Sequence, residues 1–361
     1  MQHTLRHHLL SPILLLALTG GALAADEEKE EPAAVDPARV VFRTQVKQVI
    51  ARLDKVYGEG FFAYLSDIEV PPPYLIAYEY KPNIDRETIA QSYGDIFGNL
   101  YRVFYEEFGK MLELNPVAEP IVVLIYDSKE SYKKMREAKP ELHLPNEEFM
   151  GGYYQPGTGV LTQWWQADLW QVMFHEGTHQ LIDYATRKWD VPQTNESPWI
   201  QEGFADFMGG HERKLSYSEE EGKFITKFTL GKFIGGRYTA VQQALLSGDG
   251  YSLKDLVHLD FWSFKQAQNS QEGQGENQRL TGYVYAQGWA LVMFLNYYQD
   301  GIYKDLFHEY LAAEVRGEGG GVKFGEIFML EEDEDWAAME AEYKEFVFGK
   351  LRAMGREQRN K

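Results

Sequence analysis

Residues 173–180 read MFHEGTHQ, and this stretch constrains both the fold and the chemistry of the chain. His175 and His179 are four residues apart, which places them one turn apart on the same face of a helix. Their imidazole nitrogens can then converge on one metal ion, and neutral imidazole suits zinc. Glu176 lies beside that face, where it can take a proton from a water molecule. The stretch therefore predicts a zinc-binding helix, over residues 167–187, that also carries a general base.

A second acidic segment supplies the ligand that two histidines lack. Catalytic zinc usually takes three protein ligands and keeps one position open. Residues 198–207 read PWIQEGFADF and begin a predicted amphipathic helix over residues 198–211, in which Glu202 is the strongest candidate for the third ligand. Asp206 lies one turn later on the same face. We expect it to accept a hydrogen bond from the far nitrogen of a ligand histidine, first of all His175, and so to fix the tautomer of that ring.

The pairing of HEGTH at residues 175–179 with EGFAD at residues 202–206 resembles the gluzincins, the clan that includes thermolysin and the zinc aminopeptidases. Members of that clan take their third ligand from a glutamate on the following helix and carry an acidic residue one turn further on. The nearest overall likeness is to an uncharacterised bacterial family of exported gluzincin-like proteins, over residues 74–349. The resemblance implies a zinc hydrolase.

A third segment agrees with the resemblance, and a fourth departs from it. Residues 285–291 (YAQGWAL) are similar to the tyrosine-x-x-glycine helix start of the zinc aminopeptidases, which implies that Tyr285 stabilises the oxyanion. Tyr283, Tyr153 and Tyr154 remain alternatives for this role. The aminopeptidases carry a GAMEN strand whose glutamate holds the free amine of the substrate, but residues 151–155 of this chain read GGYYQ. Aminopeptidase specificity therefore does not follow from the resemblance.

The GGYYQ segment still fits a substrate-binding strand. An extended peptide can add to the open edge of a sheet through main-chain hydrogen bonds. We predict Gly152, Tyr153 and Tyr154 as substrate-binding residues on such an edge.

The order of the predicted elements indicates an α+β fold. Residues 120–126 (PIVVLIY) form a dense apolar run that predicts a buried strand. Strands are also predicted at 74–80 and, as a pair, within 151–161, whereas the chain after residue 198 is predicted to be mostly helical. We expect a gluzincin-like architecture, in which a mixed sheet places its edge strand over the zinc helix and a mostly helical C-terminal lobe follows. An aromatic stripe in a predicted helix over 86–114 is interpreted as core.

The N-terminus is typical of an exported chain. Arg6 precedes an apolar stretch at residues 9–18, which is too short to span a bilayer, and Ala22-Leu23-Ala24 offers a signal-peptidase site. We predict a signal peptide over 1–24, cleaved after Ala24, so that the mature chain is periplasmic or extracellular and has no transmembrane span; an uncleaved anchor is the alternative. The remaining units are predicted in the following order: an acidic spacer at 25–38, a hydrolase domain at 39–349 with lobes 39–187 and 188–349, and a tail at 350–361.

Composition narrows the possible partners. The formal net charge is −19, which disfavours nucleic acid because phosphate binding requires a basic face. The chain has no cysteine, so any zinc site has to use histidine and carboxylate ligands. Four histidines of the mature chain lack acidic partners in the sequence and are interpreted as packed or surface residues: His143, His211, His258 and His308.

These observations favour a metallopeptidase that acts on a peptide or protein. In this reading Glu176 is the general base and Tyr285 the oxyanion donor, with Zn²⁺ held by His175, His179 and Glu202. A catalytically silent binding protein with the same fold, and a zinc hydrolase of non-peptide substrates, are the alternatives. The identity of the substrate, endo- versus exopeptidase action and the oligomeric state stay open.

Overall fold

The structure is a computed structural model. It describes residues 37–59, 62–65, 74–79, 86–114, 116–117, 119–146, 151–156, 158–165, 169–186, 197–219, 222–269 and 274–359. The predicted signal peptide and residues 25–36 of the predicted spacer lie outside these ranges.

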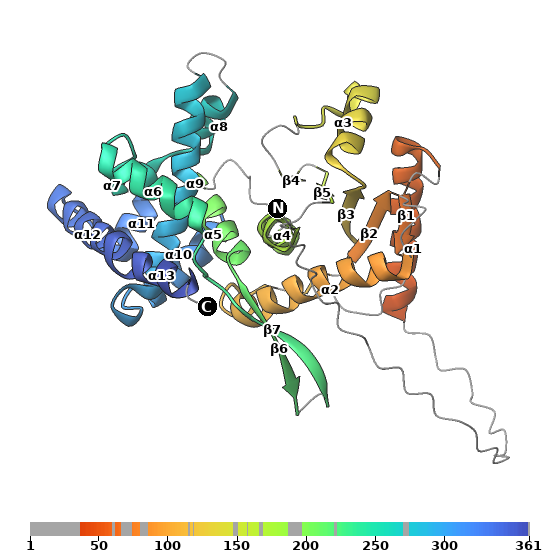
Figure 1. Cartoon of the computed structure of the whole chain (residues 1–361), viewed down its shortest axis with the longest axis horizontal. Coiled ribbons are helices and arrows are strands. Elements are labelled where there is room, and N and C mark those ends of the chain that lie inside the picture. Colours follow the sequence, from red (N-terminus) through yellow and green to blue (C-terminus); the bar gives the residue numbers. More distant parts are fainter. Residues whose placement is uncertain are drawn as a thin grey trace, which may run out of the picture.

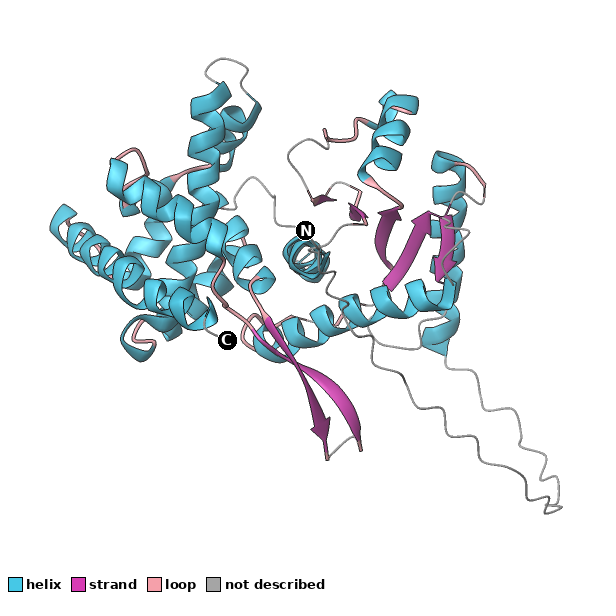
Figure 2. Cartoon of the chain, in the orientation of Figure 1, coloured by secondary structure: helices cyan, strands magenta, loops and turns pink. Residues whose placement is uncertain are grey.

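Helices predominate in the part of the chain that the structure describes (Figure 2). The α-helices are α1 Pro37–Tyr57, α2 Arg86–Phe104, α3 Lys129–Ala138, α4 Leu169–Thr186, α5 Pro198–Gly209, α6 Gly235–Ser247, α7 Leu253–His258, α8 Phe261–Asn269, α9 Gln274–Tyr297, α10 Lys304–Val315, α11 Gly321–Phe328, α12 Asp333–Phe346 and α13 Arg352–Arg359. Shorter helical turns are Tyr105–Gly109, Pro140–Leu142, Tyr298–Asp300 and Val347–Leu351. The strands are β1 Phe62–Leu65, β2 Tyr74–Glu79, β3 Ile121–Tyr126, β4 Gly152–Gln155, β5 Val160–Trp164, β6 Glu212–Ser218 and β7 Lys223–Thr229.

Five strands form one mixed sheet in the order β1-β2-β3-β5-β4. The central strands β2, β3 and β5 are parallel, while β1 and β4 pair antiparallel at the two edges. Every residue of β3 is buried, as its continuous apolar run predicts for a strand covered on both faces. The strand β4, which contains residues 152–155 of the GGYYQ segment, is an edge strand as predicted.

Helices cover both faces of this sheet (Figure 1). Alternate residues of a strand point to opposite faces, and the core divides accordingly. Ile76 and Val123 pack with the aromatic stripe of α2 and with α4, whereas Leu75 and Val122 pack with α1 and α3. The aromatic stripe of α2 is thus core, as predicted.

Two polar side chains of α4 fix this helix on the sheet. The amide nitrogen of Gln180 donates to the carbonyl oxygens of Val122 at 2.8 Å and Gly159 at 3.0 Å. The hydroxyl of Tyr184 donates to the carbonyl oxygen of Gly159 at 3.0 Å. Buried polar groups are costly without partners, so these bonds favour one register of α4 against the sheet. That register sets the positions of His175 and His179.

The helix α5 packs tightly against α9 at a pair of glycines. A Cβ atom on Gly203 would lie 2.4 Å from the backbone carbon of Gly288, and one on Gly288 would lie 2.3 Å from the carbonyl oxygen of Trp199. Only glycine allows two helix backbones to approach this closely. The contact brings Glu202, beside Gly203, close to the helix that carries Tyr285.

Three features differ from the sequence-based expectation. The strand β1 was not predicted. Residues 212–229, which fall in the stretch expected to be mostly helical, form the antiparallel ribbon β6–β7, which projects from the body of the molecule in Figure 1. Helical structure continues through Arg359, where a tail was expected, and Leu351 is fully buried. Among the described helices, none combines the length and the apolar character that crossing a bilayer requires.

Candidate metal centre

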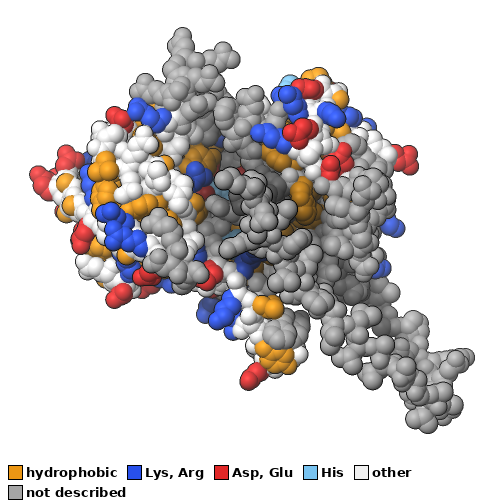
Figure 3. Space-filling view, viewed as in Figure 1, with side chains coloured by type: hydrophobic (Ala, Val, Ile, Leu, Met, Phe, Trp, Pro, Cys, Tyr) orange, Lys and Arg blue, Asp and Glu red, His pale blue; other side chains and the backbone are white. Residues whose placement is uncertain are grey.

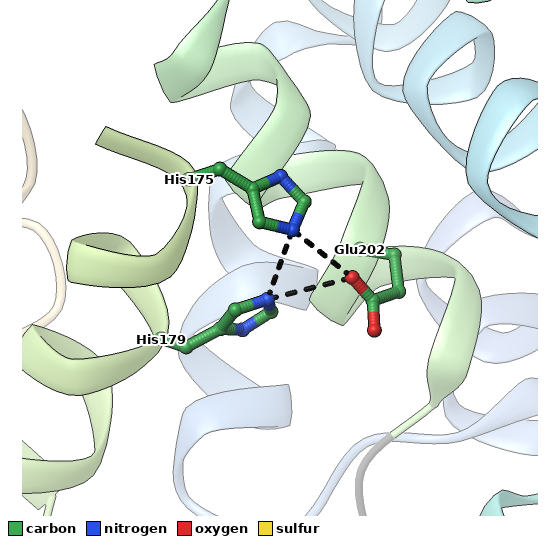
Figure 4. Close-up of side chains that lie close together, drawn as sticks. All are labelled: His175, His179 and Glu202. Carbon is green, nitrogen blue, oxygen red and sulfur yellow. Dashed lines mark hydrogen bonds and ion pairs between the residues drawn. The ribbon is translucent and has the colours of Figure 1, made fainter. Parts of the chain in front are cut away.

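Three side chains from α4 and α5 converge in the arrangement that the sequence predicts (Figure 4). The Nε2 atoms of His175 and His179 lie 3.4 Å apart. The Oε2 atom of Glu202 lies 3.2 Å from Nε2 of His175 and 3.4 Å from Nε2 of His179. The three ligand atoms therefore form a nearly equilateral triangle.

The size of this triangle fits a tetrahedral zinc ion. Nitrogen or oxygen ligands at the usual zinc distances from a tetrahedral centre are separated by about 3.3–3.4 Å. The three observed separations are 3.2, 3.4 and 3.4 Å. Two imidazoles and one carboxylate are also the donor types that catalytic zinc sites use, with a fourth position left for water or substrate. The donor set and its spacing therefore fit the ion that the sequence predicts.

Protons compete with a metal for the same atoms. Burial lowers the pKa of His175, but its hydrogen bonds and charge interactions with Asp206 and Glu202 outweigh burial and raise that pKa to about 10. Burial raises the pKa of Glu202, but the hydrogen bonds from His175 and His179 outweigh it and hold the pKa well below its ordinary value. Without a metal these opposite pKa shifts favour a protonated imidazole beside an ionised carboxylate. Metal binding would release that proton.

Asp206 lies behind His175, as its place one turn after Glu202 predicts. Its Oδ1 atom is 3.0 Å from Nδ1 of His175, and the residue is only 3% exposed. When Nδ1–H donates to this carboxylate, the lone pair of His175 is left on Nε2, the atom that faces the ligand triangle. The contact therefore selects the tautomer that binds metal.

Glu176 is held between the ligand helix and the edge strand. Its Oε2 atom accepts a hydrogen bond of 2.9 Å from the backbone N–H of Tyr154 in β4. Burial raises the pKa of Glu176, and the neighbouring His175 and His179 oppose that shift. A carboxylate with a raised pKa is better suited to accept and return a proton near neutral pH. Glu176 in this environment can therefore accept a proton.

Tyr285 is the tyrosine of α9 that faces the centre. Its ring stacks on that of His175, with centroids 6.3 Å apart and planes at 16°. Burial raises the pKa of Tyr285 well above its ordinary value, and the charges of Glu202 and Glu176 add to this effect. The hydroxyl group therefore stays protonated and available as a donor. Tyr283, two residues earlier on the same helix, is directed away from this face.

The remaining predicted site residues lie on β4. Tyr154 is on the face of the sheet that α4 covers, and its hydroxyl donates to Asp183, one turn after His179. Tyr153 points to the opposite face, where its ring packs 6.0 Å from that of Tyr132. Gly152 precedes them on the same edge, paired with Gln163. Only Tyr154 of this group directs its side chain towards the ligand helix.

Sequence reasoning missed Arg237 in α6. Its Nε atom lies 2.5 Å from Oδ2 of Asp206, and its guanidinium carbon lies 4.8 Å from the centre of the Tyr285 ring. No local pattern links residue 237 to a motif that ends at residue 206, so the sequence offers no signal for it. By contrast, His211 is a packed residue as interpreted, with its ring centre 4.2 Å from that of Phe174 and the two planes tilted by 37°.

Comparison of the sequence with protein families found no family that matches, and a search of curated proteins found no similar sequence.

Proposed function

We propose that this protein is an exported zinc metallopeptidase of the gluzincin type, with Zn²⁺ held by His175, His179 and Glu202. The convergence of these three ligand atoms at separations of 3.2–3.4 Å is the observation that carries the proposal. It is supported by the HEGTH sequence of α4 and by the carboxylate of Asp206 behind His175. The fold is also compatible, since the ligand helix lies between a mixed sheet and a helical half, as the resemblance implies.

The reaction that we infer is hydrolysis of a peptide bond. A bound zinc ion supplies Lewis-acid polarisation of the scissile carbonyl and lowers the pKa of water. Glu176 takes a proton from the attacking water and passes it to the leaving amine. The N–H of Tyr154 orients the Glu176 carboxylate for this transfer. Tyr285 donates a hydrogen bond to the carbonyl oxygen as charge develops there.

The surface is compatible with a protein or peptide substrate rather than nucleic acid. The chain carries a formal net charge of −19. Among the described side chains on the face that Figure 3 shows, lysine and arginine are interspersed with aspartate and glutamate and do not gather into one basic patch. A polyanion would find no continuous counter-charge there.

The test combines metal analysis with cleavage of a peptide library. We expect about one zinc ion per chain, as three-ligand sites hold. Glu176→Gln should keep zinc and the fold, since Glu176 is not a ligand, but should lose about 10²–10⁴-fold in hydrolysis because the proton acceptor is gone. Glu130→Gln, an exposed position on α3, is the matched control and should cleave like the wild type.

Two results would decide against this function. Cleavage by Glu176→Gln at the wild-type rate would mean that another group is the base. Zinc and peptide binding by the wild type without any cleavage, from mildly acidic to mildly alkaline pH, would favour a binding protein that has kept the fold.

A further inference from the structure

Two nitrogens of Arg237 contact the carboxylate of Asp206, which lies behind His175. Its Nε atom lies 2.5 Å from Oδ2 of Asp206, and its Nη2 atom donates to Oδ1 at 3.2 Å. Because Asp206 is almost fully buried, its charge needs close partners, and Arg237 supplies an ion pair at Oδ2 and a hydrogen bond at Oδ1, which together restrain the carboxylate. The orientation of Asp206 is therefore set from α6.

The same carboxylate oxygen faces the metal ligand. Oδ1 of Asp206 is 3.0 Å from Nδ1 of His175, and Nε2 of that ring points into the ligand triangle. A continuous line of polar contacts thus runs from Arg237 through Asp206 to His175. A rotation of the carboxylate would move Oδ1 away from Nδ1, and the ring of His175 would lose the contact that holds it in place.

Arg237 also contacts the second group that the reaction requires. Its guanidinium carbon lies over the ring of Tyr285, 4.8 Å from the ring centre. The ring of Tyr285 in turn stacks on that of His175. Only arginine combines a planar fork of donors with a flat cationic face, so one side chain holds the carboxylate and the tyrosine at once.

We propose that Arg237 is a positioning residue of the metal centre, which acts through Asp206 to orient His175 and through ring contact to place Tyr285. This inference rests on the proposed function, because it assigns to Arg237 a part in zinc binding. Arg237 is not among the three candidate ligands, and its contacts run to Asp206 and Tyr285.

Arg237→Lys is the first test, because it keeps the charge but loses the fork and the flat face. We expect the zinc affinity, measured by chelator competition, to fall by about tenfold, at the low end of the range for groups that orient a metal ligand. The visible spectrum of the cobalt-substituted protein should change as well, since it reports ligand geometry. Arg279→Lys is the matched control: Arg279 pairs with Asp249 at 2.8 Å and lies over Tyr283, but on an exposed surface. It should leave affinity and spectrum unchanged.

A double-mutant cycle separates positioning from a general structural role. If Arg237 acts through Asp206, Arg237→Lys combined with Asp206→Asn should lose no more zinc affinity than Asp206→Asn alone. Additive losses would overturn the inference. The unfolding midpoint of each metal-free variant serves as a check on folding. Arg237→Gln, which retains an amide donor without the fork, replaces the lysine variant if the latter does not fold.

The outcomes also distinguish this inference from the proposed function. If the wild type binds zinc through His175 and Arg237→Lys keeps the wild-type affinity and cobalt spectrum, the inference is wrong and the metal site stands. If His175→Ala binds zinc as tightly as the wild type, the metal site is elsewhere, and both proposals fail.

Discussion

Tyr285 offers a test of transition-state stabilisation at a single hydroxyl group. In the proposed mechanism Tyr285→Phe removes one donor to charge that develops only during the reaction, while the ring that stacks on His175 remains. We expect kcat to fall by about 10²–10³-fold with little change in KM, because the lost bond forms only in the transition state. Steady-state kinetics on a peptide identified from the library provide the measurement.

The control for this change lies on the same helix. Tyr283→Phe also removes a buried hydroxyl from α9, but from the side that faces away from the metal centre. It should leave kcat unchanged. If Tyr285→Phe raised KM instead and left kcat intact, Tyr285 would bind substrate in the ground state, and the oxyanion role would pass to another donor.

The close crossing of α5 and α9 provides a test at the level of helix packing. Gly203→Ala would place a methyl group 2.4 Å from the backbone of Gly288, where no side-chain rotation can relieve the contact. The two helices would have to separate, and overpacking of this kind typically costs about 1–3 kcal/mol. The separation would also move Tyr285, one turn before Gly288, away from Glu202. We expect a lower free energy of unfolding in denaturant titration, together with reduced activity.

A glycine-to-alanine change elsewhere on α9 should raise the free energy of unfolding instead of lowering it. Gly282 also lies within this helix, but nothing lies within 4 Å of the point where its Cβ would be. Gly282→Ala should therefore raise stability by up to about 1 kcal/mol through helix propensity. Equal stability of Gly203→Ala and the wild type would show that the crossing tolerates a methyl group, contrary to the packing described.

The candidate ligands come from two halves of the molecule, so a bound metal would make the stability of the fold depend on that metal. His175 and His179 belong to α4, which is fixed to the sheet by Gln180, whereas Glu202 belongs to α5, which packs on the helical half. A zinc ion would therefore hold the two halves together. A ligand that binds only the folded state stabilises it by about 2.7 kcal/mol at one hundred times Kd. We expect zinc to raise, and a chelator to lower, the unfolding temperature in calorimetry.

Single substitutions show whether the three ligands act as one site. His179→Ala should abolish the increase in unfolding temperature with zinc. His143→Asn should retain it, because His143 is an exposed histidine with a positive φ of 48° that asparagine tolerates. An equal increase for His179→Ala and the wild type would place zinc at another site.

Local pattern accounts for the elements that were predicted correctly. The apolar run of β3 and the four-residue spacing of His175 and His179 depend on neighbours in sequence, and the structure contains both as expected. The ribbon β6–β7 was missed although Leu215 and Tyr217 alternate with polar residues. Both are exposed, so the alternation did not indicate a buried face. To predict this ribbon one has to know which residues pair across it, and the paired residues are 5 to 17 positions apart in the sequence.

The sequence by itself determined the candidate ligand set, its spacing on two helices and the place of Asp206 one turn beyond Glu202, because helix geometry converts residue intervals into faces. Only the tertiary structure decided that Arg237 grips Asp206, that Tyr285 rather than Tyr283 faces His175, and that Tyr153 turns away from the centre. The first two of these contacts join residues 31 and 110 positions apart in the sequence. They depend on how closely α5, α6 and α9 pack. That packing is set by shape complementarity at positions such as Gly203 and Gly288. Shape complementarity of this kind leaves no periodic pattern in the sequence.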